Sequence, residues 1–294
     1  MTGTIRTFVL LAALTAIFMG VGGAIGGREG AVIALAVAAA MNLWAWWGSD
    51  RAVLRMHAAQ PLTPAEAPRL YGMVQGLAAR AGIPMPALYL IHEAQPNAFA
   101  TGRSPDHAAI ALNQGLLDLM DEREVAGVVA HEMAHIKHRD TLILAVGATL
   151  AGAVGYLAQF GMMAGRGDGR RGNPLAGLLL AIFGPLAAML VQMAVSRARE
   201  FEADAEGARI CGDPEWLASG LAKLEGMKRG IVNAGAEAHP STAHMFIVNP
   251  LSGTGLAGFF ATHPPTEERI ARLLAMRGVA APARPASRRR GPWG

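Results

Sequence analysis

The sequence predicts a mainly α-helical integral membrane protein, in which four apolar helices accompany an α+β domain with a small β-sheet. Of the 294 residues, 52% are hydrophobic and only 16% are charged, which is a low charge content for a soluble protein. The apolar residues collect into four long runs, and the polar segments around them contain short helical and alternating patterns. Composition and patterning therefore indicate membrane spans joined to a folded domain.

Two apolar runs at the start of the chain predict a transmembrane hairpin. They cover residues 8–26 and 31–47, and only Gly27-Arg-Glu-Gly30 separates them. The first run also fits a cleavable signal sequence, because small residues occur near its end, around Ala24. The second run favours the hairpin, since it is long enough to span a bilayer and ends in tryptophans, which prefer the membrane interface.

Residues 51–140 are polar and mixed, so we expect them outside the bilayer as the first part of the folded domain. Thr63-Pro-Ala-Glu66 predicts a capping box that opens a helix reaching Arg80, and Gly82 is expected to end this helix. Three short alternating runs predict the sheet: residues 87–92, 97–101 and 107–112.

The stretch His131-Glu132-Met-Ala-His135 predicts a metal-binding helix. Apolar residues recur around it at helical spacing, and Asp121 with Glu124 is typical of a capped helix start. The two histidines are four residues apart and share one face, where they can bind one divalent ion, and Glu132 lies beside them to take a proton from water. A chance match is expected in roughly one such chain in a hundred, so we prefer this interpretation to a coincidental pair on a solvated helix.

A catalytic zinc ion takes three protein ligands, so a third ligand is expected elsewhere. His138 lies about 10 Å along the helix from His131, too far to bind the same ion. Another common pattern places a third histidine six residues after the second, but that position is Thr141. Glu200 is the better candidate, and Asp204 is placed to accept the other ring N–H of a ligand histidine. On the residues alone, an ordinary acid on a helix surface is the better explanation of Glu200.

Two further apolar runs predict a second hydrophobic hairpin, at residues 141–164 and 174–195. The metal-binding helix is expected to continue into the first of these runs. By helical rise, His135 is about 9 Å from Thr141, so we expect the metal just outside the hydrocarbon. The basic segment 166–173 between the runs leaves open whether this hairpin crosses the membrane completely.

Residues 196–278 are expected to complete the folded domain, and residues 279–294 to form a disordered basic tail. Met245–Val248 is a possible short strand. Gly253-Thr-Gly-Leu-Ala-Gly258 matches a dinucleotide-binding pattern by letter, but little room for a helix follows it and no acidic residue is suitably placed downstream. We therefore expect neither a nucleotide nor a nucleic acid as a partner.

Several stretches resemble the M48 metallopeptidases, and the resemblance runs in the same order from about residue 1 to residue 278. They are His131–His135, Arg199–Ala205, Asn97–Gly102 and Thr262–Arg269. The resemblance implies a zinc endopeptidase of the gluzincin type with one Zn²⁺ per chain. It assigns His131, His135 and Glu200 as metal ligands and Glu132 as the catalytic base.

The resemblance also implies residues that contact the substrate. The strand with Asn97, Ala98 and Phe99 corresponds to an edge that pairs with an extended substrate backbone, although the residues alone favour a plain structural strand. His263 matches the family's candidate oxyanion donor, and a loop histidine that shapes the following helix entry explains it equally well. Arg269, from the same motif, is a further substrate-binding candidate.

We therefore expect a membrane-bound zinc endopeptidase that cleaves misfolded or damaged membrane proteins. Basic residues are more numerous near the span ends on the side of the metal helix, which predicts a cytoplasmic domain on a bacterial inner membrane. A catalytically inactive membrane scaffold that binds a structural zinc ion remains an alternative, but we find no fourth protein ligand for such an ion. An intramembrane protease is disfavoured by the charged residues that flank the motif. The lone Cys211 excludes an internal disulfide, and the sequence leaves the oligomeric state open.

Overall fold

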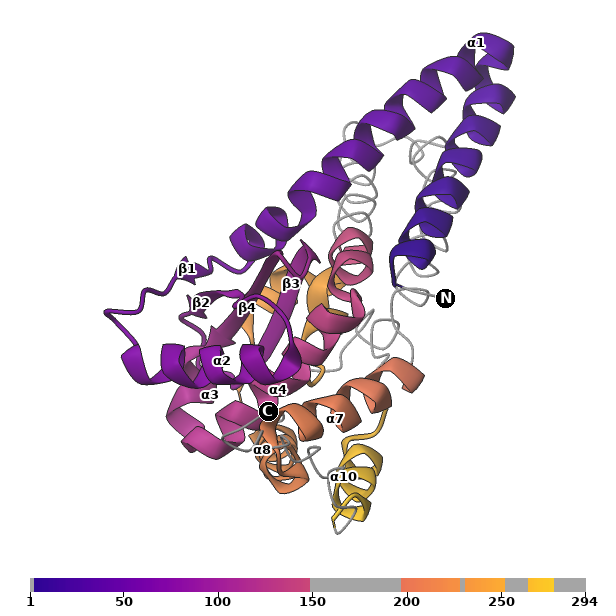
Figure 1. The fold of residues 1–294 in the computed structure, drawn as a ribbon. Coiled ribbons are helices and arrows are strands. Elements are labelled where there is room, and N and C mark those ends of the chain that lie inside the picture. The colour runs from indigo at the N-terminus through magenta and orange to yellow at the C-terminus, as the bar shows by residue number, and fades with distance from the viewer. Residues whose placement is uncertain (1–2, 149–196, 228–230, 252–263, 278–294) are drawn as a thin grey trace, which may run out of the picture.

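The structure is a computed structural model that describes residues 3–148, 197–227, 231–251 and 264–277. In this part of the chain, a long helical hairpin projects from a folded domain (Figure 1). The domain consists of a small sheet with helices packed against it, so the apolar arms and the folded part are distinct regions of the molecule.

The hairpin is the helix α1 (Gly3–Met56), which is interrupted at Gly26 and Gly27. Gly27 has a φ of 59°, a left-handed conformation that favours glycine, and the chain reverses direction there. The apolar runs predicted at residues 8–26 and 31–47 therefore form the two arms of one hairpin. The second arm continues past the predicted end to Met56.

Within the described residues, one helix is long and apolar enough to cross a membrane, the arm Gly26–Met56. The other arm contains the shorter apolar helix Thr7–Gly20. Asn42 Nδ2 donates a hydrogen bond of 3.0 Å to Thr15 Oγ1, so a polar contact links the two arms.

The second hairpin, predicted at residues 141–164 and 174–195, lies outside the described residues except for 141–148. Residues 141–148 are helical and buried. The predicted basic tail and the segment Gly253–Gly258 also lie outside the described residues. Four membrane helices therefore stay a prediction.

The sheet contains four strands in the order β1-β2-β4-β3. Their bounds are β1 (Gln60–Pro61), β2 (Ala87–Ile91), β3 (Ala98–Ser104) and β4 (His107–Asn113). β2 and β4 are parallel, whereas the other neighbouring pairs are antiparallel. The three predicted strands are confirmed, and β3 is the outermost strand on one side. β1 was not predicted, because two residues, one of them proline, give no alternating pattern.

The helix α2 (Pro68–Ala81) starts later than predicted. The Glu66 carboxylate accepts hydrogen bonds from the backbone and hydroxyl of Thr63, but these bonds close a turn and the helix begins only at Pro68. Proline fits the first helical position, since it has no N–H to leave unpaired. Gly82 ends the helix in a left-handed conformation, as predicted.

The helix α4 (Glu122–His138) follows the short helix α3 (Gln114–Leu119) and forms the centre of the domain. It was wrong to expect α4 to continue into the next apolar run. Arg139 adopts a left-handed conformation with a φ of 61°, and the Asp140 N–H bonds back to the carbonyl of His135. This C-cap ends the helix before the apolar residues begin.

Of the remaining described helices, α7 (Arg197–Cys211) and α8 (Pro214–Met227) pack directly on α4, and α10 (Thr266–Ala275) packs against both of them. The short helix α9 (Ala234–Ala238) and the 3₁₀ helix η1 (Pro240–Met245) contact each other. A Cβ atom added to Gly207 would lie 2.9 Å from the Cα of His131, so α7 approaches the backbone of α4 closely at this glycine. This close contact brings the beginning of α7 to the face of α4 that carries the predicted metal ligands.

Candidate metal centre

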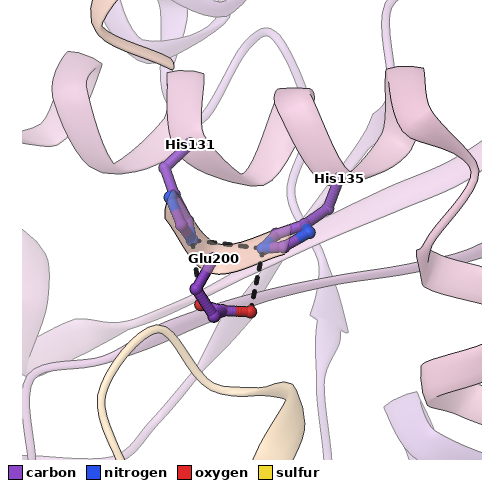
Figure 2. A group of neighbouring side chains, drawn as sticks. All are labelled: His131, His135 and Glu200. Atoms are coloured by element: carbon purple, nitrogen blue, oxygen red, sulfur yellow. Dashed lines mark hydrogen bonds and ion pairs between the residues drawn. The ribbon is translucent and has the colours of Figure 1, made fainter. Parts of the chain in front are cut away.

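Three side chains from two helices meet inside the domain (Figure 2). His131 and His135 project from the same face of α4, and Glu200 reaches them from the first turn of α7. The two histidine Nε2 atoms are 3.2 Å apart. Oxygens of the Glu200 carboxylate lie 3.8 Å from His131 Nε2 and 3.6 Å from His135 Nε2. All three side chains are buried, so their polar atoms face one another instead of water.

These separations fit a single divalent ion. A tetrahedral zinc ion lies about 2.0–2.1 Å from each nitrogen or oxygen ligand, which places neighbouring ligand atoms about 3.3–3.4 Å apart. The measured separations of 3.2, 3.6 and 3.8 Å are close to that value. Within the described residues, these three form the one group with the spacing of a metal site, and His138 does not belong to it.

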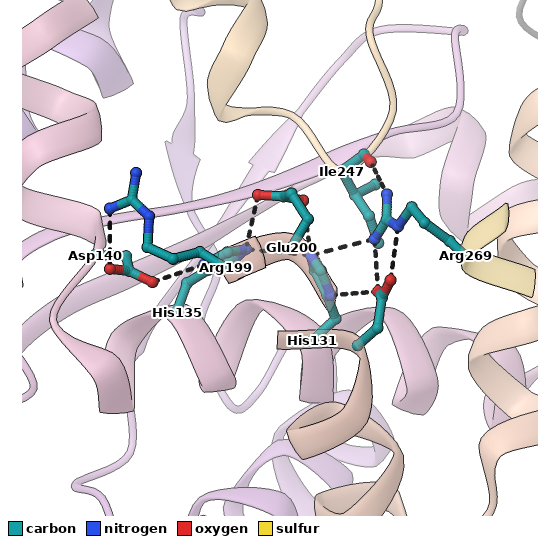
Figure 3. A network of polar contacts seen from close by, with 8 residues as sticks. His131, His135, Asp140, Arg199, Glu200, Ile247 and Arg269 are labelled. Carbon is teal, nitrogen blue, oxygen red and sulfur yellow. Dashed lines mark hydrogen bonds and ion pairs between the residues drawn. The ribbon is translucent and has the colours of Figure 1, made fainter. Parts of the chain in front are cut away.

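A carboxylate other than Glu200 lies next to the Nδ1 atom of each histidine (Figure 3). Asp204 Oδ1 is 3.0 Å from His131 Nδ1, and Asp140 Oδ2 is 3.4 Å from His135 Nδ1. An acceptor at Nδ1 favours the tautomer that leaves Nε2 available as a ligand atom. Asp204 was predicted for this position, whereas Asp140 was not. The left-handed turn at Arg139 folds Asp140 back onto the last turn of α4.

Two buried arginines bind these carboxylates. Arg269 donates from Nε and Nη2 to the two oxygens of Asp204, at 2.8 and 2.7 Å, and Arg199 Nη1 donates to Asp140 Oδ1 at 3.1 Å. Arg269 Nη2 also lies 3.5 Å from His131 Nε2. Arg269 was predicted to bind substrate, but its two shortest ionic contacts are with Asp204. The network therefore joins α4, α7 and α10 around the candidate metal ligands.

A family model for Peptidase family M48 matches residues 64–277, which is more than half of the chain. The chain belongs to peptidase family M48. It is similar to a "Protease HtpX homolog" from Ralstonia pickettii, with 57% identity over 92% of this chain and 96% of that protein. A protein of the same description from Methylibium petroleiphilum is 55% identical over 94% of this chain and 98% of its own length.

The solved structure of S. mikatae Ste24p is also similar, with a TM-score of 0.46 and 16% identity. The match covers 92% of this chain and 64% of the Ste24p chain. The M48 relatives establish an HtpX-like peptidase, and membership of this metallopeptidase family implies a metal. His131, His135 and Glu200 are the described residues that can hold it.

Burial and charge affect the two histidines of this M48 peptidase differently. Burial lowers the pKa of His131 to about 4 and outweighs the opposing effect of the Asp204 carboxylate. Burial acts in the same direction on His135, but the carboxylates of Glu200 and Asp140 outweigh it and raise the pKa to about 9. A ligand nitrogen must be unprotonated, so a metal ion bound to His135 would displace a proton from it.

Glu132 lies between the two histidines in the sequence of α4 and is 2% exposed. Burial raises the pKa of its carboxyl group to about 8, while His135 opposes this shift and Glu200 adds to it. A divalent cation beside Glu132 would favour its charged form. Burial therefore favours the protonated carboxyl group, and a bound cation would favour the carboxylate that a general base requires.

The predicted substrate-binding residues Asn97, Ala98 and Phe99 lie at the outer edge of the sheet, at the start of β3. This edge is in contact with residues 246–248 of the same chain. The short strand predicted at Met245–Val248 is only an isolated bridge at Phe246, because Met245 belongs to η1. His263, the candidate oxyanion donor, lies outside the described residues. The edge strand and the metal ligands therefore belong to one buried region of the M48 peptidase.

Proposed function

We propose that this M48 peptidase is a zinc-dependent endopeptidase whose ion is held by His131, His135 and Glu200. The near-tetrahedral spacing of three buried ligand atoms carries the proposal. Two imidazoles and one carboxylate leave a coordination position open, as in catalytic zinc sites. Zinc bound there would supply a Lewis acid that polarises the scissile carbonyl and acidifies water.

Glu132 performs the proton transfer in this proposal. Its carboxylate takes a proton from the attacking water and passes it to the nitrogen of the leaving amine, a role typically worth about 10²- to 10⁴-fold in rate. Asp204 and Asp140 act as positioning residues in this proposal, because each carboxylate lies beside Nδ1 of a ligand histidine and favours the tautomer that directs Nε2 toward the ion. His263 is the proposed oxyanion donor, on the family resemblance alone.

The proposed substrates are polypeptides in an extended conformation, in particular unfolded or damaged membrane proteins. Addition of a strand to a sheet edge is a general mode of peptide recognition, and Asn97, Ala98 and Phe99 supply such an edge. Arg269 Nη1 donates a hydrogen bond of 2.7 Å to the carbonyl of Ile247, which supports its ability to bind a peptide backbone. These groups would align the substrate beside the metal ligands.

We also propose that α1 is embedded in a bacterial inner membrane, with the peptidase domain in the cytoplasm. The apolar arm Gly26–Met56 supports insertion, and the distribution of basic residues near the predicted spans supports the orientation. In a Cys211→Ser background, a cysteine at exposed Arg28 should react with an impermeant thiol reagent from the periplasmic side. A cysteine at exposed Asp106 should not, and the opposite labelling pattern would invert the orientation.

Metal content and turnover, measured together, test the assigned roles. Glu200→Gln removes the charge of a ligand but keeps its shape, so the dialysed protein should lose zinc. Glu202→Gln is the matched control, because Glu202 is exposed on another face of α7 and should not affect zinc. Glu132→Gln should keep zinc and cleave casein at least about 100-fold more slowly.

Two results would refute these roles. Unchanged turnover in a zinc-loaded Glu132→Gln protein would exclude Glu132 as the base. Zinc loss from Glu202→Gln but not from Glu200→Gln would show that the third ligand and the facing side of α7 had been assigned incorrectly.

A further inference from the structure

The edge of β3 is already paired within the chain. β3 is the outermost strand of the sheet, and its outer side faces the segment Phe246–Val248. Phe246 forms an antiparallel bridge with Phe99, and the Ile247 N–H donates a hydrogen bond of 3.0 Å to the carbonyl of Ala98. The segment therefore takes the position of an additional strand.

Side chains bind the same segment from both sides. Asn97 Nδ2 donates to the carbonyl of Val248 at 2.7 Å, and Asn97 Oδ1 accepts from the Val248 N–H at 3.4 Å. Arg269 Nη1 donates to the carbonyl of Ile247 at 2.7 Å, and the same guanidinium binds Asp204 of the metal centre. Residues 246–248 are therefore held between the sheet edge and the metal centre.

We propose that residues 246–248 are an internal occupant of the substrate-binding edge and that this structure is a latent state of the peptidase. The inference rests on the proposed function, in which an extended substrate pairs with β3. A substrate cannot form this pairing while Ile247 donates to Ala98. The metal ligands and Glu132 are at most 5% exposed, so a polypeptide reaches them only after a covering segment moves.

Phe246 anchors the occupying segment. Its ring packs edge-on against Phe99 and against His57, with ring centroids 5.1 Å apart in both pairs. His57 directly follows α1, and its Nε2 forms a hydrogen bond of 2.8 Å with Thr242 Oγ1, just before the segment. A change at the end of the long α1 arm would therefore act directly on the residues that cover the edge.

Weakening this anchor should activate the enzyme. Phe246→Ala removes two ring contacts. Casein cleavage by the full-length, zinc-loaded protein should therefore rise about 5- to 150-fold, the factor that loss of two aromatic pairs implies for the opening equilibrium. Leu77→Ala is the control, because it truncates a fully buried side chain of α2 and should not raise cleavage. A fall in cleavage by Phe246→Ala at unchanged zinc content would overturn the proposal.

A reversible cross-link tests the pairing even if Phe246→Ala folds poorly. Ala98 and Ile247 lie next to the Phe99–Phe246 bridge, and the Ile247 N–H bonds to the Ala98 carbonyl. Hydrogen-bonded residues of antiparallel segments have Cα atoms about 5.5 Å apart, within disulfide range. In a Cys211→Ser background, the oxidised Ala98→Cys/Ile247→Cys protein should not cleave casein, and reduction should restore cleavage at constant zinc content.

Two outcomes of the cross-linking experiment would overturn the latent state. The first is equal cleavage before and after reduction, and the second is failure of the cross-link to form. A different result would refute the proposed peptidase function. In that case none of the zinc-loaded proteins would cleave casein, neither the unaltered protein nor Phe246→Ala nor the reduced cross-linking variant.

Discussion

Replacing Asp140 with Asn should weaken metal binding, although Asp140 is not a ligand. Asp140 is 4% exposed, its Oδ2 lies 3.4 Å from His135 Nδ1, and its Oδ1 accepts a hydrogen bond from Arg199. Asparagine keeps the size of the side chain but removes the charge that orients the imidazole and raises its basicity. Loss of such a partner typically lowers metal affinity about 10- to 100-fold. This corresponds to about 1.4–2.7 kcal/mol of binding free energy.

Competition with a chelator of known affinity measures this loss, and a melting temperature should be recorded for each protein. The second measurement is needed because Asp140→Asn also removes an ionic partner of buried Arg199, which destabilises the fold. Arg199→Gln breaks the same ion pair but leaves the carboxylate on His135, so it should lose less zinc affinity at a similar melting temperature. Asp118→Asn, at an exposed position of α3, controls for removal of a charge.

Zinc affinity that is the same in Asp140→Asn and in the unaltered protein would refute a positioning role for Asp140. Equal losses of affinity in Asp140→Asn and Arg199→Gln would also refute it, because both substitutions would then act through stability alone.

Gly207→Ala should destabilise the fold by about 1–3 kcal/mol and loosen the metal site, since the added Cβ meets the backbone of His131 at 2.9 Å. Gly76→Ala, where a Cβ meets nothing within 4 Å, should not destabilise, and equal effects of the two changes in denaturant unfolding would contradict the close helix contact. Burial, with a smaller effect from His239, lowers the pKa of His57 to about 4, below the unfolded value of about 6.5. The unfolded chain therefore binds the extra proton first as the pH falls, and the free energy of unfolding should decrease by about 2 kcal/mol between pH 7 and pH 5. His57→Gln should remove this part of the dependence, and an identical pH profile of the melting temperature in both proteins would argue against it.

Features that depend on neighbouring residues were predictable from the sequence. The Asp121 side chain accepts from the Glu124 N–H while the Glu124 side chain accepts from the Asp121 N–H, so the predicted capping box starts α4. The four-residue spacing of His131 and His135 placed their Nε2 atoms 3.2 Å apart. Each of these features lies within about one helical turn, where the backbone geometry alone determines which side chains meet.

Contacts between distant segments were not predictable from residue patterns. Asp140 and Arg199 are 59 positions apart, and neither has a distinctive pattern around it. Glu200 was a candidate from its residues, but only the family resemblance favoured it over an ordinary surface acid, because acids four residues apart are common on helix surfaces. The pairing of β3 with residues 246–248 was missed because a short apolar segment does not indicate its partner.

The residues around the candidate metal site are far apart in the sequence, so the ribosome makes them at different times. Arg269, which binds Asp204 behind His131, is 138 positions later in the chain than that histidine. At about 5–20 residues per second, a ribosome needs about 7–28 s to cover this interval. A nascent chain thus carries the histidine pair well before Glu200 exists, and the arginine comes last. Translation itself therefore keeps the enzyme incomplete until almost the whole folded domain has been made.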